Sequence, residues 1–505
     1  MNTNIHSIAV IGAGTMGRGI LQLFAQAGHP VRCYDAAEGA AHNAIAFVRD
    51  LIERAVAKQR YSCEEGDAII ARMTACSCVE ELEGCDLAIE AVVEDLDVKR
   101  ELFRTLETVL GDSAILTSNT SSLMVADIAA GCRLPERVAG LHFFNPVPLM
   151  KVAEVIAAVR TAPATVAALQ AVIAAAGHRA VVAADQPGFL VNHAGRGLYT
   201  EGLRILEEQV ASAQDVDTLM REAAGFRMGP FELLDLTGLD VSGKVMESIY
   251  RQFHQEPRFR PSPLIAPRVA AGLFGRKTGE GWYRYVGNDK QSVPAVPAPA
   301  ASVACTFWVD PAADECQLLR ALVSDTGSRL VEQPAEADVV FVQFWGDDVS
   351  RYCAAHGLDA TRTVAVDPLP GLENHRTLML SSVTRAEVRD AAWALLAAQG
   401  VPVTLIGDSC GFVVQRVLAT IVNIAADIAQ RGIASVTDIE DAVRLGLGYP
   451  QGPLSLGDAI GGDRVLAILT RMYELSGDPR YRPSPWLARR VALGRSLLTG
   501  EAGRR

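Results

Sequence analysis

Residues 7–17 read Ser-Ile-Ala-Val-Ile-Gly-Ala-Gly-Thr-Met-Gly, and this stretch decides the fold. Four of its first five residues are apolar and most of these are β-branched, which is typical of a buried parallel strand. Of the glycines that follow, Gly12 permits a tight turn, Gly14 lets the backbone approach a pyrophosphate, and Gly17 lets a helix pack closely on the strand. The pattern predicts a dinucleotide-binding α/β fold, against the alternative of a glycine-rich turn that binds nothing.

The residues after this loop complete a strand–helix–strand unit. A helix is predicted over 15–27, because Gly28-His29-Pro30 is a stop signal. Its amino-terminal amides and the positive end of its dipole would face the phosphates. The next predicted strand, 31–34, ends at Asp35, whose carboxylate can accept hydrogen bonds from an adenosine ribose diol. Two alanines follow, with no arginine for a 2′-phosphate, so the sequence favours NAD over NADP.

The bulk properties are those of a large globular protein. At 505 residues the chain is too long for one core, and two to four domains are expected. The net charge of −12 argues against nonspecific nucleic-acid binding. It does not exclude a polyanionic ligand, because local basic groups can bind phosphates on an acidic protein.

Several features predict a cytoplasmic protein without a membrane anchor. No apolar run reaches the roughly 18 residues that span a bilayer, and the first predicted strand starts too early for a signal peptide. The ten cysteines are scattered, which predicts reduced thiols. Cys76-x-Cys78 has no second pair to complete a zinc site, so no metal is expected.

Two short segments carry the candidate chemistry. The first, Thr117-Ser118-Asn119-Thr120-Ser121-Ser122, follows a predicted strand at 114–117. Hydroxyls and an amide at a strand end can form the wall of a polar pocket. The alternative is a helix amino-terminal cap made by Ser121 or Ser122.

The second segment is Leu141-His142-Phe143-Phe144-Asn145-Pro146-Val147-Pro148, after a predicted strand at 138–141. Alone, a histidine between Leu and Phe is more often a core residue than a base. However, the prolines stiffen the loop beyond His142, and Glu154 lies in an apolar segment where a carboxylate needs a partner. A Glu–His pair fixes the tautomer and stabilises the imidazolium formed when the histidine removes a proton.

Together these segments closely resemble the 3-hydroxyacyl-CoA dehydrogenase family over residues 5–285. Family members carry similar Ser-Asn-Thr-Ser-Ser and His-Phe-Phe-Asn-Pro segments and a following Glu. Segments 185–192, 229–235 and 275–283 also match. The resemblance implies NAD-dependent oxidation of a (3S)-3-hydroxyacyl-CoA, with His142 as the base and Glu154 as its orienting group. It also implies that Ser121 and Asn192 position the substrate oxygens.

The same resemblance implies NAD as the cofactor and an acyl-CoA as the small-molecule partner. Glu94 and Lys99 would contact the ribose and nicotinamide region, and Asn145 would line the nicotinamide side. The CoA-binding hairpin around 38–62 matches poorly, and solvated helix charge is the better interpretation of Lys58 and Arg54. The implied cofactor-binding residues are Gly12, Ala13, Gly14, Thr15, Met16, Gly17, Asp35, Glu94, Lys99, Ser121, Asn145 and Lys277.

The second half repeats landmarks of the first. Gly188-Phe189-Leu190-Val191-Asn192 recurs as Gly411-Phe412-Val413-Val414-Gln415, an offset of 411 − 188 = 223 residues. Gly229-Pro230 recurs as Gly452-Pro453 with the same offset, which indicates a duplication. The strand at 337–344 is matched with the one before Glu94, and 363–367 with the one before Ser118. Because this half lacks the glycine loop, the Ser-rich cluster and the His-Phe-Phe-Asn-Pro segment, no catalysis is expected from it.

The predicted architecture is a Rossmann-type NAD-binding domain and an all-α domain, followed by a degenerate duplicate of both. We expect the second helical domain to pack on the first as an intramolecular pseudo-dimer, with homo-oligomers left open. The predicted domains are an NAD-binding domain at 1–184, a helical domain at 185–290, a Pro/Ala linker at 291–302, a shortened Rossmann-like domain at 303–406 and a second helical domain at 407–505.

The substrate is left open by the sequence. The two-copy build resembles the 3-hydroxyadipyl-CoA dehydrogenases of phenylacetate breakdown and some 3-hydroxybutyryl-CoA dehydrogenases. A dicarboxylate acyl chain needs a basic group at its far end, for which Arg196, Arg204 and Arg227 are candidates. Two rival interpretations are an NAD-dependent polyol or sugar-acid dehydrogenase and a non-catalytic NAD-binding protein.

Overall fold

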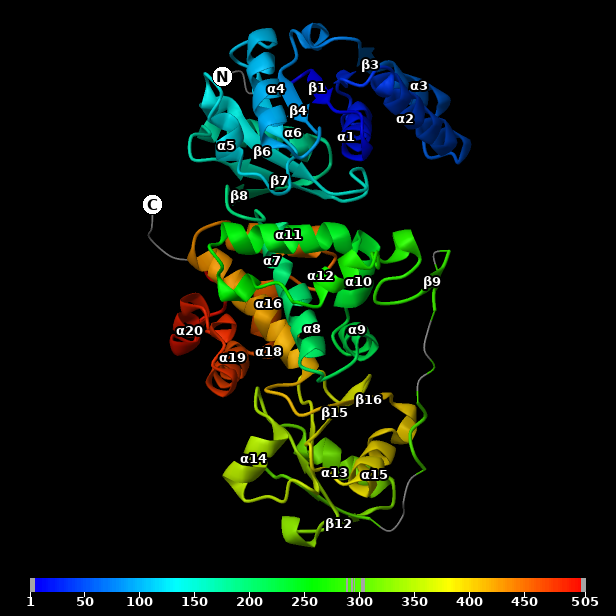
Figure 1. The fold of residues 1–505 in the computed structure, drawn as a ribbon, viewed down its shortest axis with the longest axis vertical. Coiled ribbons are helices and arrows are strands. Elements are labelled where there is room, and N and C mark those ends of the chain that lie inside the picture. Colours follow the sequence, from blue (N-terminus) through cyan, green and yellow to red (C-terminus); the bar gives the residue numbers. More distant parts are fainter. Residues whose placement is uncertain (1–4, 288, 292–293, 295, 301–304, 501–505) are drawn as a thin grey trace. The chain divides into compact units, whose positions relative to one another are not determined.

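The computed structural model describes residues 5–287, 289–291, 294, 296–300 and 305–500, whose elements are drawn in Figure 1. They form two compact units. The first contains the residues up to 193 together with 428–448, and the second contains 194–427 and the residues from 449 onward. Of the predicted linker, residues 292, 293, 295, 301 and 302 lie outside the described residues.

An eight-stranded sheet forms the centre of the first unit, in the order β3-β2-β1-β4-β5-β6-β7-β8. Neighbouring strands are parallel except β6 and β7, which are antiparallel. The strand order reverses between β1 and β4, where doubly wound sheets bind ligands beyond their carboxyl ends. The Rossmann-type fold is therefore confirmed. The strands are β1 Ile8–Ile11, β2 Val31–Tyr34, β3 Met73–Cys76, β4 Leu87–Glu90, β5 Ile115–Ser118, β6 Val138–Phe143, β7 Val152–Ala157 and β8 Arg179–Ala184.

Helices pack on both faces of this sheet, which explains why a central strand such as β1 is apolar and buried along its whole length. Ile8 and Val10 of β1 join one hydrophobic core with α1, α2 and α6, whereas Ala9 and Ile11 join another with α4 and α5. One helix, α17, comes from far along the chain and packs on β7 and β8. The helices are α1 Thr15–Gln26, α2 Ala40–Ala57, α3 Cys63–Ala71, α4 Leu96–Val109, α5 Val125–Ala129, α6 Pro163–Ala175, α7 Val191–Ala194 and α17 Val436–Gly446.

The second unit contains two sets of helices. A Cβ on Gly197 of α8 would lie 3.0 Å from the Ile421 Cα of α16, so these two helices approach closely at a point that suits glycine. The first set is α8 Arg196–Glu207, α9 Ala213–Glu222, α10 Pro230–Thr237, α11 Leu239–Gln252 and α12 Ile265–Ala270. The second is α16 Val413–Gln430, α18 Pro453–Ile460, α19 Gly462–Ser476 and α20 Pro485–Ala492.

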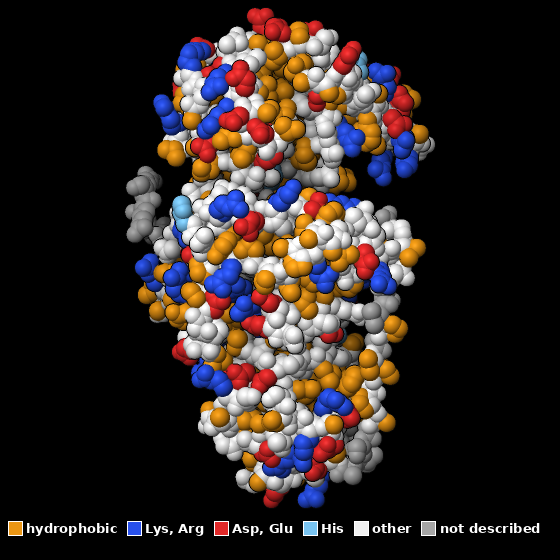
Figure 2. All heavy atoms as spheres, viewed as in Figure 1, with side chains coloured by type: hydrophobic (Ala, Val, Ile, Leu, Met, Phe, Trp, Pro, Cys, Tyr) orange, Lys and Arg blue, Asp and Glu red, His pale blue; other side chains and the backbone are white. Residues whose placement is uncertain are grey.

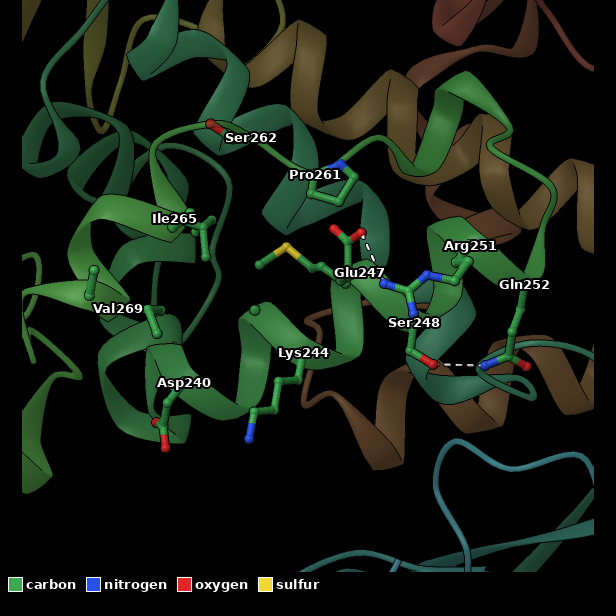
Figure 3. A pocket seen from close by; sticks show the side chains of 14 residues that line it. Asp240, Lys244, Glu247, Ser248, Arg251, Gln252, Pro261, Ser262, Ile265 and Val269 are labelled. Carbon is green, nitrogen blue, oxygen red and sulfur yellow. Dashed lines mark hydrogen bonds and ion pairs between the residues drawn. The ribbon is translucent and has the colours of Figure 1, made fainter. Parts of the chain in front are cut away.

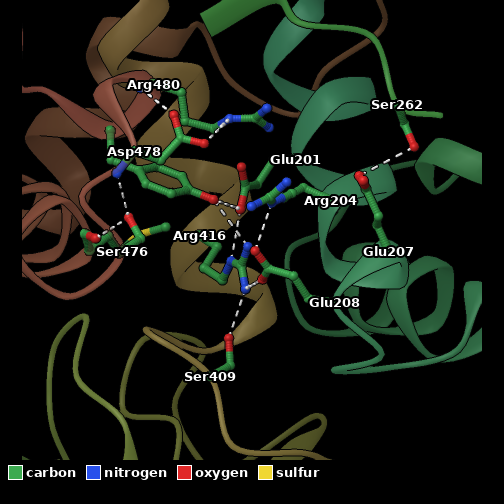
Figure 4. A network of polar contacts seen from close by, with 12 residues as sticks. Glu201, Arg204, Glu207, Glu208, Ser262, Ser409, Arg416, Ser476, Asp478 and Arg480 are labelled. Carbon is green, nitrogen blue, oxygen red and sulfur yellow. Dashed lines mark hydrogen bonds and ion pairs between the residues drawn. The ribbon is translucent and has the colours of Figure 1, made fainter. Parts of the chain in front are cut away.

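Helix α16 carries a buried polar network that ties it to α8 (Figure 4). The Arg416 guanidinium donates to Glu201 at 2.7 Å and to Glu208 at 2.8 Å, and it also meets the Tyr481 hydroxyl at 3.1 Å. Burial disfavours the charge of Arg416, but Tyr481 and the two carboxylates outweigh it and raise its pKa well above the usual range. These contacts link the two helical sets through one cation.

Among the described residues, α16 has the length and apolar composition of a membrane-spanning helix. However, 89% of that window is buried inside the protein, and it contains the ion-paired Arg416. A buried core helix of a globular protein can have the same length and apolar composition.

A second, six-stranded sheet lies in the second unit, in the order β12-β11-β13-β14-β15-β16. Its strands are parallel except for the antiparallel pair β14–β15. The strands are β11 Thr306–Val309, β12 Arg329–Leu330, β13 Val339–Val342, β14 Thr363–Val366, β15 Arg376–Leu380 and β16 Val403–Ile406. Their helices are α13 Cys316–Asp325, α14 Val349–His356 and α15 Ala386–Leu396.

Strand β14 shares pairing features with two strands of the first sheet. Residues 363–367 were matched with the strand before Ser118, and β14 pairs parallel with β13, as β5 does with β4, but it also pairs antiparallel with β15, as β6 does with β7. The registers agree, because Glu154 pairs with Val181 and Thr377 pairs with Thr404, both 223 residues later. In this register residue 367, which follows β14, faces Thr377 as His142 faces Glu154.

Asp367 is fully buried at that place. Its Oδ1 accepts a hydrogen bond from the Gln415 side chain at 2.9 Å, and its backbone N–H donates to the Thr377 carbonyl at 3.2 Å. Burial raises the pKa of the Asp367 carboxyl to about 7, despite hydrogen bonds from Leu369 and Gln415.

This carboxyl predicts a pH dependence of stability. Its pKa in the folded protein exceeds the value of about 4 in an unfolded chain, so its contribution is complete below about pH 4 and is lost as pH rises through about 7. Relative to Asp367→Asn, which cannot ionise, the free energy of unfolding of the wild type should fall by a few kcal/mol, in order of magnitude, over this range. Urea unfolding of both proteins at about pH 5 and about pH 8 measures the effect.

Burial also raises the pKa of Asp217 to about 7. Because Asp217 titrates in both the wild type and Asp367→Asn, its effect on stability cancels in the comparison. An equal stability difference between the two proteins at both pH values would contradict the prediction.

The surface carries charges of both signs. Figure 2 shows Lys and Arg side chains intermixed with Asp and Glu on the face that it draws. Basic groups that can meet phosphates are therefore present despite the net charge of −12.

Candidate active site

The glycine-rich loop between β1 and α1 has the shape that a dinucleotide needs. A Cβ on Gly12 would collide with the Ala91 carbonyl after β4, and a Cβ on Gly17 would collide with the Gly12 carbonyl. By contrast, a Cβ on Gly14 would meet no atom within 4 Å. Gly14 is also the N-cap of α1 and offers no side-chain cap, so the amides of the first helical turn face open space that suits a phosphate.

Asp35 lies beside this loop, at the end of β2. Its carboxylate accepts hydrogen bonds from the backbone N–H of Ala13 at 2.6 Å and of Ala37 at 2.8 Å. The contact with Ala13 fixes the carboxylate against the loop. This is where an adenosine ribose is bound in folds of this type, so the residues fit NAD.

A buried ion pair joins β4 to α4 next to the loop. The Lys99 ammonium is 1% exposed and lies 2.5 Å from Oε1 of Glu90 and 3.3 Å from Oε2 of Glu94. The other oxygen of Glu90 accepts the Ser118 hydroxyl of β5 at 2.6 Å. Glu94 and Lys99, each predicted to contact the cofactor, are thus in contact with each other, whereas Glu90 was missed. Its only signal in the sequence is an acid at the end of an apolar strand.

Glu94 also organises the Ser-rich segment. It accepts the Thr120 hydroxyl at 2.6 Å, the Ser122 hydroxyl at 2.9 Å and the backbone N–H groups of Ser121 and Ser122 at 3.1 Å. Burial opposes its charge, but the hydrogen bonds from Thr120 and the charge of Lys99 hold the pKa of Glu94 below its usual range. The segment is therefore folded around a carboxylate.

The alternative interpretation of Ser121 or Ser122 as a helix cap is wrong. The next helix, α5, starts at Val125, and its first two N–H groups donate to the Asp185 carboxylate at 3.0 and 2.7 Å. Asp185 lies after β8, so this cap could not be recognised from local sequence. The backbone of Ser121 is held by Glu94, and its hydroxyl is not needed to cap α5.

His142 and Glu154 form a buried pair. They face each other across the antiparallel strands β6 and β7, with His142 Nδ1 2.5 Å from Glu154 Oε2. His142 lies inside β6 instead of after a strand ending at Leu141. The other oxygen of Glu154 accepts the backbone N–H groups of Leu190 at 2.9 Å and Val191 at 2.7 Å. The predicted pairing is confirmed, while its catalytic role stays a prediction.

The other predicted site residues are Asn192, Asn145 and Lys277, and each lies in a different part of the fold. Asn192 follows Val191 in α7, one residue beyond an N–H that binds Glu154. Asn145 is exposed in the loop after β6. Lys277 lies in the second unit, where its ammonium is 2.5 Å from Asp240. Asn119, whose amide the sequence placed in the wall of a polar pocket, accepts the Phe143 N–H at 2.8 Å and so ties the two chemistry-bearing segments together.

Two family models match the chain. The model for the 3-hydroxyacyl-CoA dehydrogenase NAD-binding domain matches residues 7–186. The model for the 3-hydroxyacyl-CoA dehydrogenase C-terminal domain matches residues 188–285 and, a second time, residues 411–503. Both helical sets of the second unit therefore match the same model.

Comparison with individual proteins points to the same family as the two family models. The chain is 35% identical over 499 residues to 3-hydroxyadipyl-CoA dehydrogenase of Escherichia coli (strain K12), covering 98% of this chain and 99% of that protein. It is 38% identical over 288 residues to the mitochondrial hydroxyacyl-coenzyme A dehydrogenase of Sus scrofa, covering 56% and 91%. The crystal structure of 3-hydroxybutyryl-CoA dehydrogenase from Escherichia coli K12 superimposes with a TM-score of 0.86 at 34% identity, covering 97% and 99%. The chain belongs to the 3-hydroxyacyl-CoA dehydrogenase family and is an NAD-dependent oxidoreductase.

Proposed function

We propose that this enzyme oxidises (3S)-3-hydroxyacyl-CoA with His142 as the general base. The observation that carries the proposal is the buried His142–Glu154 pair at 2.5 Å. Because Nδ1 faces the carboxylate, Nε2 is the nitrogen that accepts the proton of the 3-hydroxyl. Glu154, which three hydrogen bonds fix in place, stabilises the imidazolium that results. Bound NAD supplies the hydride acceptor.

Ser121 and Asn192 complete the proposed set by positioning the substrate oxygens. Ser121 lies on the loop that Glu94 holds rigid, and Asn192 lies next to the N–H that binds Glu154. Positioning of this kind brings reacting atoms to roughly 3–3.5 Å. We assign NAD binding to the loop 12–17, Asp35, Glu94, Lys99, Ser121, Asn145 and Lys277, as the family resemblance implies.

For the acyl group, the proposal is 3-hydroxyadipyl-CoA. A full-length relative carries this substrate in its name, and the helical domain contains a cavity of about 760 Å³ between α11 and α12 (Figure 3). Met246, Ile265 and Val269 give it an apolar wall, and Asp240, Lys244, Glu247 and Arg251 also line it. Asp240 pairs with Lys277 at 2.5 Å and Glu247 pairs with Arg251 at 3.4 Å, so the Lys244 ammonium is the group that suits an acyl chain ending in a carboxylate.

The arginines proposed from the sequence fit this role less well. Arg196 is buried with its guanidinium 4.9 Å from the centroid of the Tyr199 ring, and Arg204 is paired with Glu208 at 2.7 Å. Arg227 is exposed. Arg251 also has a carboxylate partner, Glu247 at 3.4 Å, so Lys244 is the better residue to test.

The test measures NADH formation with L-3-hydroxybutyryl-CoA and 3-hydroxyadipyl-CoA in parallel. We expect Lys244→Met to lower kcat/KM for the dicarboxylate roughly tenfold, because a charge-assisted hydrogen bond is lost, and to leave the monocarboxylate within about twofold. Lys58→Met, outside this cavity, should leave the ratio of the two substrates unchanged.

A wild-type preference for 3-hydroxybutyryl-CoA would contradict the dicarboxylate proposal. It would favour the second candidate, a short-chain 3-hydroxybutyryl-CoA dehydrogenase, which is the name carried by the structure with the TM-score of 0.86.

The second half is, in our proposal, a degenerate duplicate that serves as an intramolecular pseudo-dimer partner. Two hydrogen bonds support this. Ala184 N–H donates to the Ile433 carbonyl at 2.8 Å, and Gly407 N–H donates to the Val210 carbonyl at 2.8 Å. Gly407 lies 223 positions after Ala184, and Ile433 lies 223 positions after Val210. Each α/β region is therefore bonded to the helical region of the opposite half.

The duplicate has lost the groups that the proposed reaction needs. The counterparts of His142, Glu154 and Asn192 are Asp367, Thr377 and Gln415, which are all buried. Asp367 takes the place of the imidazole and Thr377 that of the orienting carboxylate, so the three lack the histidine–carboxylate pair that the proposed reaction uses. Domain boundaries near residues 184, 290 and 406 remain part of this proposal.

A further inference from the structure

We propose that helix α17 of the second half braces the catalytic pair of the first half, and that Gly446 is a positioning residue for Glu154. This inference rests on the proposed function, because it assumes that His142 and Glu154 carry out the chemistry. It adds an active role for a half of the chain that has no catalytic groups of its own.

The carboxyl end of α17 lies directly behind the residues that hold Glu154. A Cβ on Gly446 would lie 3.0 Å from Cγ2 and 3.2 Å from Cγ1 of Val191, and 3.5 Å from Cγ1 of Val152. Val191 donates its N–H to Glu154 Oε1 at 2.7 Å, and Val152 precedes Glu154 on the same strand, β7. The backbone of α17 at Gly446 therefore sets the position of both flanks of this carboxylate.

Polar contacts fix α17 along the whole length of β8. Arg179, at the start of β8, donates to Asp441 at 2.8 Å and to Asp438 at 2.7 Å, both on α17. At the other end of β8, Ala184 N–H donates to the carbonyl of Ile433, just before α17. With Gly446 packed near β7, the helix is held at three separate points.

This arrangement explains why the second half is retained. β8 is the last strand of the sheet, and α17, which packs on β7 and β8, lies more than 200 residues later in the chain. Any movement of α17 would be transmitted to Val191 and hence to the hydrogen bond with Glu154. Since the proposed base depends on that carboxylate, the second half contributes to turnover without touching substrate.

The experiment uses the full-length protein with Gly446→Val, and with the milder Gly446→Ala in case the larger side chain prevents folding. We expect kcat for L-3-hydroxybutyryl-CoA to fall roughly 10- to 100-fold with valine, because small misplacements of reacting groups have effects of this size. NADH affinity should stay within about twofold. Substrate deuterated at C3 should show a larger isotope effect on kcat than in the wild type, because the chemical step becomes slower.

The matched control is Gly457→Val in α18. A Cβ there would lie 2.5 Å from Leu497 and 2.7 Å from Val422, so it crowds the second half without touching the residues around Glu154. Rescue is tested with Val191→Ala in the Gly446→Val background, which makes room for the new side chain and keeps the N–H that binds Glu154. Recovery of kcat in the double variant supports the brace.

If Gly446→Val and Gly457→Val have a similar kcat and a similar isotope effect, the proposed role of α17 is wrong and the proposed function stands. Failure of the wild type to oxidise any 3-hydroxyacyl-CoA would overturn the proposed function itself, so the two failures are distinguishable.

Discussion

His142→Ala is expected to lower kcat by roughly 10²–10⁴-fold, the usual contribution of a positioned general base. NADH affinity should stay within about twofold, because the glycine-rich loop and Asp35 lie on other strands and do not depend on the imidazole. Steady-state kinetics give kcat, and fluorescence titration gives the dissociation constant of NADH. The two together separate a lost base from a lost binding site.

The chain offers a second buried histidine as a control. His178 Nε2 lies 2.9 Å from the Val147 carbonyl and its Nδ1 lies 3.3 Å from the Ala176 carbonyl, so both nitrogens face the backbone. His178→Gln should lower stability more than turnover. Equal losses of kcat and NADH affinity in His142→Ala would undo the assignment of His142 as the base.

Arg416→Met is expected to destabilise the protein by about 3–5 kcal/mol, the cost of removing one partner from a buried ion pair. The variant leaves Glu201, which is 0% exposed, without the guanidinium that lies 2.7 Å from it (Figure 4). Among the described residues, the Tyr481 hydroxyl, at 3.0 Å, then remains as the hydrogen-bond donor to Glu201. Denaturant unfolding should therefore show a much lower midpoint than in the wild type. The rate of turnover should change little as long as the protein is folded.

A double variant tests the cause. Arg416→Met with Glu201→Gln removes both charges, keeps the hydrogen bond to Tyr481, and should recover part of the lost stability. Arg251→Met is a matched control, because that arginine is 76% exposed and its pair with Glu247 is solvated; its effect should lie within about 0.5 kcal/mol. A loss in Arg416→Met as small as in the control would argue against a structural role for this network at the helical interface.

Much of the first half could be predicted from local sequence. The strand–loop–helix unit around Gly12 follows from short-range rules on apolar periodicity and glycine conformation. The His142–Glu154 pair could also be predicted, since a carboxylate in an apolar segment demands a partner and the histidine lies on the adjoining strand. The repeat could be found as well, because its landmarks recur at a constant offset of 223 residues.

Strand β14 shows where this reasoning ends. Apolar strands without a motif look alike in sequence, and only the antiparallel pairing with β15 reveals that Asp367 faces Thr377 as His142 faces Glu154.

Other features were decided by tertiary structure alone. Nothing near Val125 indicates that Asp185 caps α5, and nothing near Glu201 indicates that Arg416, more than 200 residues later, neutralises it. The same holds for α17, whose sequence predicts an amphipathic helix but not that it packs on β7 and β8. The physical reason is that propensity, caps and periodicity act between neighbours along the chain. Burial of charge and close packing depend instead on which distant segments the folded core brings together.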